Sequence, residues 1–234
     1  MEYKKQLLMF HNNKFVEAKI RSYNEDDINV LIAVQKCAFP PPFPPDLLWS
    51  EQQLTEHIKH FKTGCLCVEV DGEIVGSISS LIINYDEHQE EHTWHTWDKV
   101  TDQGYIRNHN EHGDTLYVVD ICVAPSFRKL QLGKWLVHSL YEVAVHYNLK
   151  RLLGGARMPH YSKYKHLYSP EKYIEKIIKG EIIDPVVTFL LKSGRTPLTV
   201  VPNYLEDEHS CHYALLMEWK NPLYKKDAPS EASS

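Results

Sequence analysis

The stretch "VDICVAPSFRKLQLGKWLV", residues 119–137, contains a strand-like run, a basic loop and a helical pattern in that order. The β-branched run ends at Pro125, the loop carries Arg128 and Lys129, and apolar residues then recur at helical spacing. The first amides of a helix have no partner within it, and its dipole favours negative charge at that end. Gly133 would let a phosphate group approach the backbone closely. The segment therefore predicts a phosphate-binding loop, although an ordinary turn from strand to helix fits it about equally well.

The sequence around this stretch predicts strands that alternate with helices. Asn24 is a candidate helix cap, and the pair Asp71-Gly72 predicts a hairpin within residues 64–83. Strands are expected over 15–23, 64–83, 115–123, 150–157, 196–204 and 211–219, and helices over 25–37, 50–61, 132–147, 169–181 and 184–194. We expect an α/β fold with a mixed sheet. A single domain would cover residues 1–222, with a long polar insertion at 84–114 and a disordered tail at 223–234.

Composition restricts the class of protein. The 234 residues are 43% hydrophobic and 24% charged, which is typical of a globular chain, and the formal charge of −5 argues against a nucleic-acid binder. The N-terminus lacks the apolar core of a secretory signal, and no run approaches the ~20 apolar residues of a membrane span. A cytoplasmic protein without membrane contact is expected. The five cysteines contain no CxxC pair, so neither a disulfide nor a zinc site is expected.

In this setting the segment "VAPSFRKLQLG" resembles the acetyl-CoA loop of the GCN5-related N-acetyltransferase (GNAT) superfamily. That loop reads Arg/Gln-x-x-Gly-x-Gly/Ala after a strand that ends in Val-x-Pro. Val123, Pro125, Arg128 and Gly133 match the pattern in register, whereas Gln131 replaces its first glycine. The order of strands and helices is also similar over residues 16–220.

Further segments resemble a narrower group within the superfamily. The segments "AFP", "HTWD", "GYI", "GGARMPHY" and "DPVVTFLL" are similar to the acetyltransferase-like domain that precedes carbon–nitrogen hydrolase domains in some bacterial proteins. This chain would be a stand-alone version of that domain.

The resemblance implies a GNAT-like central β-sheet that is splayed and flanked by helices. It also implies an N-acetyltransferase in which an amine attacks the thioester of acetyl-CoA directly. The residues expected to hold acetyl-CoA are Ile121, Cys122 and Val123 along the pantetheine arm, and Arg128, Lys129, Leu130, Gln131, Leu132, Gly133 and Lys134 around the pyrophosphate. Because main-chain amides would form this cradle, we expect Gln131 to point to solvent with a helical-type, negative φ.

Proton transfer requires a base near the thioester. Asp120 lies in an otherwise apolar strand, where an Asp is disfavoured, so it is either the catalytic base or a structural carboxylate. Tyr117 in the same strand is a lesser candidate. The family often uses a tyrosine of the late helix as the acid, but here Leu190 takes that position and Arg195 takes the position of a later Phe. Three tyrosines could substitute for it, and protonation by solvent would also suffice; they are Tyr161, Tyr164 and Tyr168.

The insertion at 84–114 is expected to form a polar loop over the site that binds the acceptor. His88, His92 and His95 have the spacing of one helical face, but the segment lacks a cap and helix length, so a polar loop is favoured over a metal site. The residues expected to bind the acceptor are Trp94, Trp97, Asp98 and Tyr161. We expect a small-molecule amine as acceptor and regard a homodimer as compatible with the sequence. The alternative is a non-catalytic, CoA-binding regulatory or interaction module.

Overall fold

The computed structural model describes residues 2–11, 13–86 and 96–226. Eight strands form one sheet in the order β1-β2-β3-β4-β5-β6-β8-β7. The strands are β1 (Lys4–His11), β2 (Lys14–Ser22), β3 (Cys65–Val70), β4 (Glu73–Ile83), β5 (Thr115–Val123), β6 (Arg151–Arg157), β7 (Thr196–Val201) and β8 (Ala214–Lys220). Neighbouring strands are antiparallel except β5 and β6, which are parallel. The mixed sheet expected from the sequence is confirmed.

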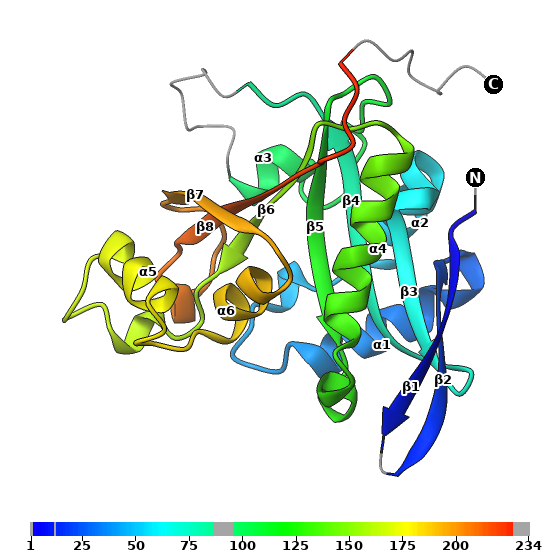
Figure 1. Cartoon of the computed structure of the whole chain (residues 1–234), viewed down its shortest axis with the longest axis horizontal. Coiled ribbons are helices and arrows are strands. Elements are labelled where there is room, and N and C mark those ends of the chain that lie inside the picture. Colours follow the sequence, from blue (N-terminus) through cyan, green and yellow to red (C-terminus); the bar gives the residue numbers. More distant parts are fainter. Residues whose placement is uncertain (1, 12, 87–95, 227–234) are drawn as a thin grey trace.

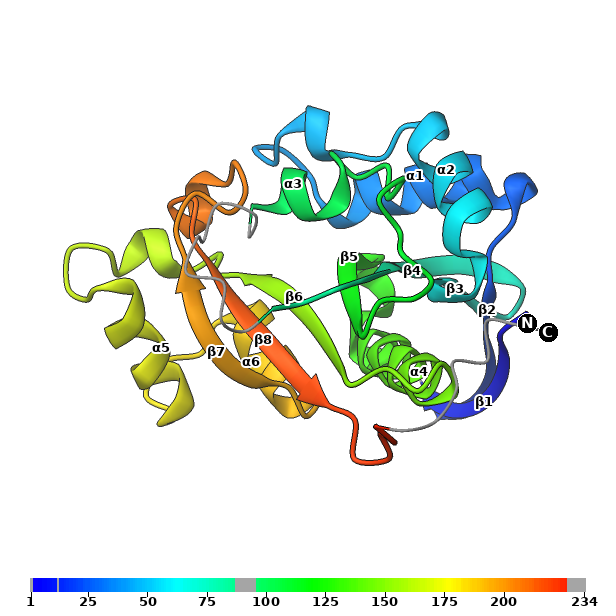
Figure 2. The same cartoon turned by 90° about the horizontal axis from the view of Figure 1, so that it is seen from above.

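Helices cover both faces of this sheet (Figures 1 and 2). They are α1 (Ile28–Ala38), α2 (Glu51–Phe61), α3 (Trp97–Thr101), α4 (Leu132–His146), α5 (Pro170–Ile178) and α6 (Pro185–Lys192). The helices α1, α2 and α3 lie on one face, and α4 and α6 lie on the other (Figure 2). No helix within the described ranges is long and apolar enough to cross a membrane.

Local sequence signals explain several of these boundaries. The Asn24 side chain caps a short 3₁₀ turn that leads directly into α1, and Ser50 forms a capping box with Gln53 at the start of α2. Asp71 and Gly72 have φ values of 50° and 85°, so they form the tight hairpin turn between β3 and β4. These are the turns and caps that the residue types predict.

The two central strands β5 and β6 separate soon after they meet. Their parallel pairing covers only Thr115–Tyr117 against Arg151–Leu153, although β5 continues to Val123 and β6 to Arg157. Figure 1 shows β6 turning away from β5 beyond this contact. The splayed sheet implied by the resemblance is therefore present, and the edge of β5 that faces β6 has no strand partner over residues 118–123.

A glycine pair marks the start of the separation on β6. A Cβ atom on Gly154 would lie 3.1 Å from a guanidinium nitrogen of Arg195, and one on Gly155 would lie 2.2 Å from the ring of Tyr204. Successive residues of a strand point to opposite faces. Arg195 therefore packs on one face of β6 and Tyr204 on the other. Each occupies space that is free only because the glycine beneath it has no side chain.

Two parts of the chain differ from the expectation or lie beyond it. The strand β1, at the edge of the sheet, was not predicted from the sequence. The tail expected at 223–234 is described only to residue 226, where the backbone of Lys225 exchanges two hydrogen bonds with the Asn148 side chain. Residues 227–234 lie outside the described residues, as do residues 87–95 of the insertion.

The close contact at Gly155 can be tested by substitution. Gly155→Ala should lower the free energy of unfolding by about 1–3 kcal/mol, because its methyl group would overlap the Tyr204 ring. Gly133→Ala is the matched control: its Cβ would lie 3.2 Å from Phe189, a much milder contact, and alanine favours a helix. Urea unfolding of both variants measures the difference, and equal stability of the two would contradict this packing.

Candidate functional site

A β-bulge in β5 lies at the centre of the candidate site. Asp120 pairs with Ser79 of β4 and Val118 pairs with Ser80, which leaves Val119 as an extra residue. The carbonyl of Val119 accepts a hydrogen bond of 2.9 Å from the indole of Trp97. The bulge therefore lies next to the point where β5 and β6 separate, and it directs Asp120 toward α1.

Asp120 is a carboxylate held in a largely apolar setting. Its Oδ2 accepts a hydrogen bond of 3.2 Å from Gln35 of α1, and Gln35 is itself fixed because its Oε1 accepts the backbone N–H of Trp49 at 2.6 Å. The side chain keeps a partly exposed surface. Burial raises the pKa of Asp120 to about 6, against the opposing effects of Gln35, a backbone amide and the positive charge of Arg157. Such a carboxylate can accept a proton near neutral pH.

Aromatic side chains lie near the bulge on the α1–α3 face. Trp97 is buried and packs near Trp49, with ring centroids 6.2 Å apart. The hydroxyls of Tyr117 and Tyr204 lie 2.8 Å apart, both rings are buried, and burial raises the pKa of each. Both hydroxyls are thus neutral at physiological pH.

Of the residues expected to bind the acceptor, one lies in this cluster and the others lie elsewhere or outside the described residues. Trp97 lies at the bulge, as described above. Asp98 is exposed on the outer side of α3, and Trp94 lies outside the described residues, as do His88, His92 and His95. Tyr161 is buried against Tyr173 and donates its hydroxyl to the carbonyl of Tyr168, so it contributes to packing near α5.

Two residues of the cluster, Gln35 and Tyr204, cannot be recognised from the sequence. Gln35 looks like one polar residue in an amphipathic helix, and Tyr204 follows a strand in a loop. Neither carries a local motif, because each acquires its role only through a partner 85 or 87 residues away. Gly155 gives an indirect signal, because a glycine within a strand indicates that another group packs closely against it; here that group is the Tyr204 ring.

The basic loop joins β5 to α4 at the open end of this strand. Residues Pro125–Leu130 form a 3₁₀ turn, and no side chain caps the N-terminus of α4. Arg128 donates hydrogen bonds to the carbonyls of Val123 and Ala38, so its side chain fastens the loop to β5 and α1. Lys129 is exposed and Lys134 half-exposed. The uncapped amides and these two lysines form a surface suited to a pyrophosphate.

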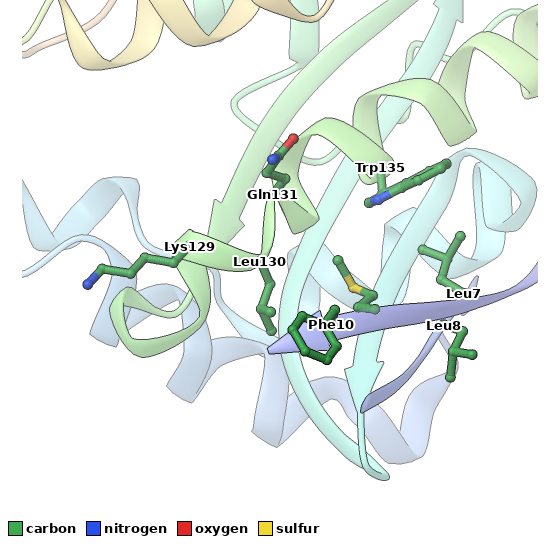
Figure 3. Close-up of a pocket in the computed structure, with 8 residues that line it drawn as sticks. Leu7, Leu8, Phe10, Lys129, Leu130, Gln131 and Trp135 are labelled. Carbon is green, nitrogen blue, oxygen red and sulfur yellow. The ribbon is translucent and has the colours of Figure 1, made fainter. Parts of the chain in front are cut away.

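Gln131 corrects one expectation. Its φ is +57° and its ψ is 23°, so it is left-handed and does not have the negative φ expected from the sequence. The chain must reverse sharply between the 3₁₀ turn and α4, and this geometry is the one that glycine adopts without strain. The side chain is nevertheless exposed and points away from β1, whereas Leu130 points toward Phe10 of that strand (Figure 3). It therefore does not fill the loop.

A hollow of about 250 Å³ lies on the β1 side of the same loop (Figure 3). Its lining residues are Leu7, Leu8, Met9, Phe10, Lys129, Leu130, Gln131 and Trp135. None of them belongs to the Asp120 cluster, so we do not assign the reaction to this hollow.

Comparison with known proteins gives consistent results. Residues 28–168 match the model of the acetyltransferase (GNAT) family. The uncharacterized N-acetyltransferase YkwB of Bacillus subtilis (strain 168) is 50% identical over 222 residues, which cover 95% of this chain and 97% of that protein. The probable hydrolase YhcX of the same organism is 40% identical over 206 residues, or 88% of this chain but only 39% of its own length.

Two solved structures share the fold. The loading GNATL domain of CurA from Lyngbya majuscula has a TM-score of 0.70 at 18% identity, with 87% of this chain and 98% of that domain covered. The GphF GNAT-like decarboxylase in complex with isobutyryl-CoA has a TM-score of 0.69 at 18% identity, with 86% and 98% covered. At this level of identity both support the fold alone.

The conformation of Gln131 leads to a stability prediction. Gln131→Gly should raise the free energy of unfolding by about 1 kcal/mol, because glycine adopts a positive φ without a steric penalty. Gln131→Ala, which keeps a Cβ atom, should bring no such gain. Urea unfolding measures both, and a less stable glycine variant would mean that the left-handed conformation is wrong.

Proposed function

Because the chain belongs to the GNAT family of acetyltransferases, we propose that it transfers the acetyl group of acetyl-CoA to the amine of a small molecule within a ternary complex. Acyltransfer and the acetyl-CoA donor follow from the family; the acceptor and the order of events are our proposal. The observation that carries it is the separation of β5 from β6 with Asp120 at its start and an uncapped, basic helix N-terminus at its end.

The free edge of β5 would bind the pantetheine arm. Residues 118–123 lack a strand partner on the β6 side, so their backbone groups can pair with the amides of the arm. We assign this contact to Ile121, Cys122 and Val123. The amides of residues 128–133, with the charges of Lys129 and Lys134, would hold the pyrophosphate. Binding to both regions fixes the thioester beside the bulge, and catalysis then relies on positioning.

Asp120 would accept the proton of the attacking amine, directly or through one water molecule. The amine nitrogen forms a bond to the carbonyl carbon, the carbon–sulfur bond breaks, and the released proton resides on the Asp120 carboxylate. Gln35 keeps the carboxylate oriented through its 3.2 Å hydrogen bond. Tyr117 lies in the same strand, paired with Tyr204, and would limit water at this point.

The acceptor face favours a small amine. Trp97 from the insertion donates to the bulge and Trp49 packs beside it, so these aromatic rings would form a wall of the acceptor site next to Asp120. Phe39 and Phe43 stack with centroids 4.8 Å apart, and the Arg157 guanidinium lies 4.8 Å from the Phe43 ring. A compact, apolar amine would match these walls better than an extended peptide.

Binding of acetyl-CoA should depend on the basic loop. Saturating acetyl-CoA should stabilise the protein by about 2.7 kcal/mol at one hundred times its Kd, seen as a higher unfolding temperature. The double variant Lys129→Gln with Lys134→Gln should weaken binding severalfold, whereas Lys59→Gln with Lys99→Gln, on α2 and α3 at the other end of the molecule from the loop (Figure 1), should not. No stabilisation at millimolar acetyl-CoA would contradict the proposal. Binding without thiol release across a panel of amines would instead favour a regulatory CoA-binding module.

The role of Asp120 predicts a pH profile. Because burial raises its pKa to about 6, turnover should fall as the pH drops through about 6, where the base becomes protonated. Asp120→Asn should lower kcat by about 10²–10⁴-fold at neutral pH while acetyl-CoA still binds. Asp98→Asn, on the exposed side of α3, is the control and should change neither quantity.

Stability separates a catalytic Asp120 from a structural one. A carboxyl whose pKa is higher in the folded state than its usual ~3.9 binds more protons when folded, so its charge destabilises the fold as the pH rises from about 4 to 6. Asp120→Asn removes this cost, so the variant should be at least as stable as the native chain at pH 7.5. A marked loss of stability would identify Asp120 as a structural carboxylate.

A further inference from the structure

Arg195 is a buried cation at the centre of the sheet. It follows α6, precedes β7 and is 4% exposed. One terminal nitrogen donates hydrogen bonds to the carbonyls of Gly154 in β6 and Met217 in β8. The guanidinium therefore lies over β6 and β8, on the face covered by α4 and α6.

No carboxylate pairs with this charge within the described part of the chain. The half-buried and buried arginines elsewhere have acidic partners: Arg21 pairs with Asp27, Arg151 with Glu218 and Arg157 with Asp207. The Nε atom of Arg195 has no hydrogen-bond acceptor at all. Burial lowers the pKa of Arg195 to about 10, so it remains charged at neutral pH. A buried charge is costly unless it is paired, so this position is suited to an anion that arrives with a ligand.

The guanidinium lies where β5 and β6 separate. A Cβ atom on Gly154 would be 3.1 Å from both the Arg195 nitrogen and the Cβ atom of Val118. Val118 and Gly154 are the first residues of their strands beyond the paired stretch. From Val118 to Val123 the strand runs about 17 Å toward the basic loop, comparable to an extended pantetheine arm. An arm held along β5 would bring its sulfur to Arg195.

We propose that Arg195 is a catalytic residue that stabilises the CoA thiolate as the thioester breaks. This inference rests on the proposed function. The amine nitrogen bonds to the carbonyl carbon, the electron pair of the carbon–sulfur bond stays on sulfur, and the amine proton goes to Asp120 on the opposite face. Arg195 keeps its proton and balances the sulfur charge. Neither Phe189 nor Leu190 of the adjacent helix α6 can donate a proton, so a fixed positive charge takes the place of an acid.

The ionisable groups around Arg195 do not titrate in the pH range in which the thiol of bound CoA would titrate. Tyr141 of α4 lies on the same face as the guanidinium, whereas Tyr117 of β5 and Tyr204 lie on the opposite face; all three act electrostatically on Arg195. Burial raises the pKa of all three, that of Tyr141 to about 12. Asp120 is already ionised above about pH 6, and burial raises the pKa of Cys122 to about 12. Between pH 6.5 and 9, below the pKa of about 10 of Arg195 itself, a bound thiol next to Arg195 would therefore titrate without interference from these neighbours.

The test is a titration of CoA bound to the full chain. The ultraviolet absorbance of the thiolate is followed with pH, and the same protein loaded with desulfo-CoA, which has no thiol, is subtracted to remove the protein's own cysteines. An ordinary thiol has a pKa near ~8.5, and a cation in contact lowers such a value by about 1–3 units. We expect the midpoint for bound CoA to be lower than that of free CoA by this amount.

Variants assign the shift to Arg195. Arg195→Met should return the midpoint to that of free CoA or above it, and Arg195→Lys should retain part of the decrease. Arg107→Met, in which an exposed arginine paired with Asp102 is removed, is the control and should leave the midpoint unchanged.

If the Arg195 variants do not fold, the titration of CoA bound to the native protein is sufficient to test the role of Arg195. Bound CoA whose thiol titrates at or above the midpoint of free CoA overturns the role of Arg195 and leaves the proposed acyltransfer intact. A failure of CoA to bind would overturn both.

Discussion

The short contact between β5 and β6 is the constraint on which the rest of the site depends. Parallel strands in a sheet usually continue their ladder, yet here only three residues of each strand pair. Beyond that point β5 pairs with β4 alone, and no strand pairs with its other edge over residues 118–123. A ligand with amides of its own can complete this edge as a strand would.

Side chains on both faces keep the two strands apart. Arg195 and Tyr204 occupy the two faces of β6 at the glycine pair, and Tyr204 bridges to Tyr117 of β5 through their hydroxyls. Trp97 binds the carbonyl that the bulge leaves free. Closing the gap would require these groups to move out of well-packed positions, so the separation is built into the packing and does not depend on a ligand.

Much of this architecture was predictable because its signals are local. The boundaries of β5 and β6 match the expected strands, and the caps at Asn24, Ser50 and Asp184 follow from residue type. The basic loop was located, as was Asp120, whose polarity contradicts its apolar strand. The strand β1 was missed because its exposed side includes Leu8 and Phe10, which hide the alternation of a surface strand.

The remaining features depend on contacts between distant parts of the chain. Gln35 reaches Asp120, and Tyr204 reaches Tyr117, only after the sheet has formed. The left-handed φ of Gln131 is set by the turn into α4, which overrides the preference of its side chain. A negative φ is expected from the residue type alone, which contains no information about that turn. The sequence shows that Arg195 departs from the family pattern. Only the structure shows that its guanidinium is buried over Gly154, where β5 and β6 separate.

Amide hydrogen exchange with and without acetyl-CoA tests the central claim most directly. If the free edge of β5 binds the pantetheine arm, amides within residues 118–123 should become protected, together with those of residues 128–134 at the start of α4, while the β1–β2 hairpin should not change. Acetyl-CoA that binds without protecting residues 118–123, or that protects the hollow lined by Leu7 and Trp135 instead, would contradict the account.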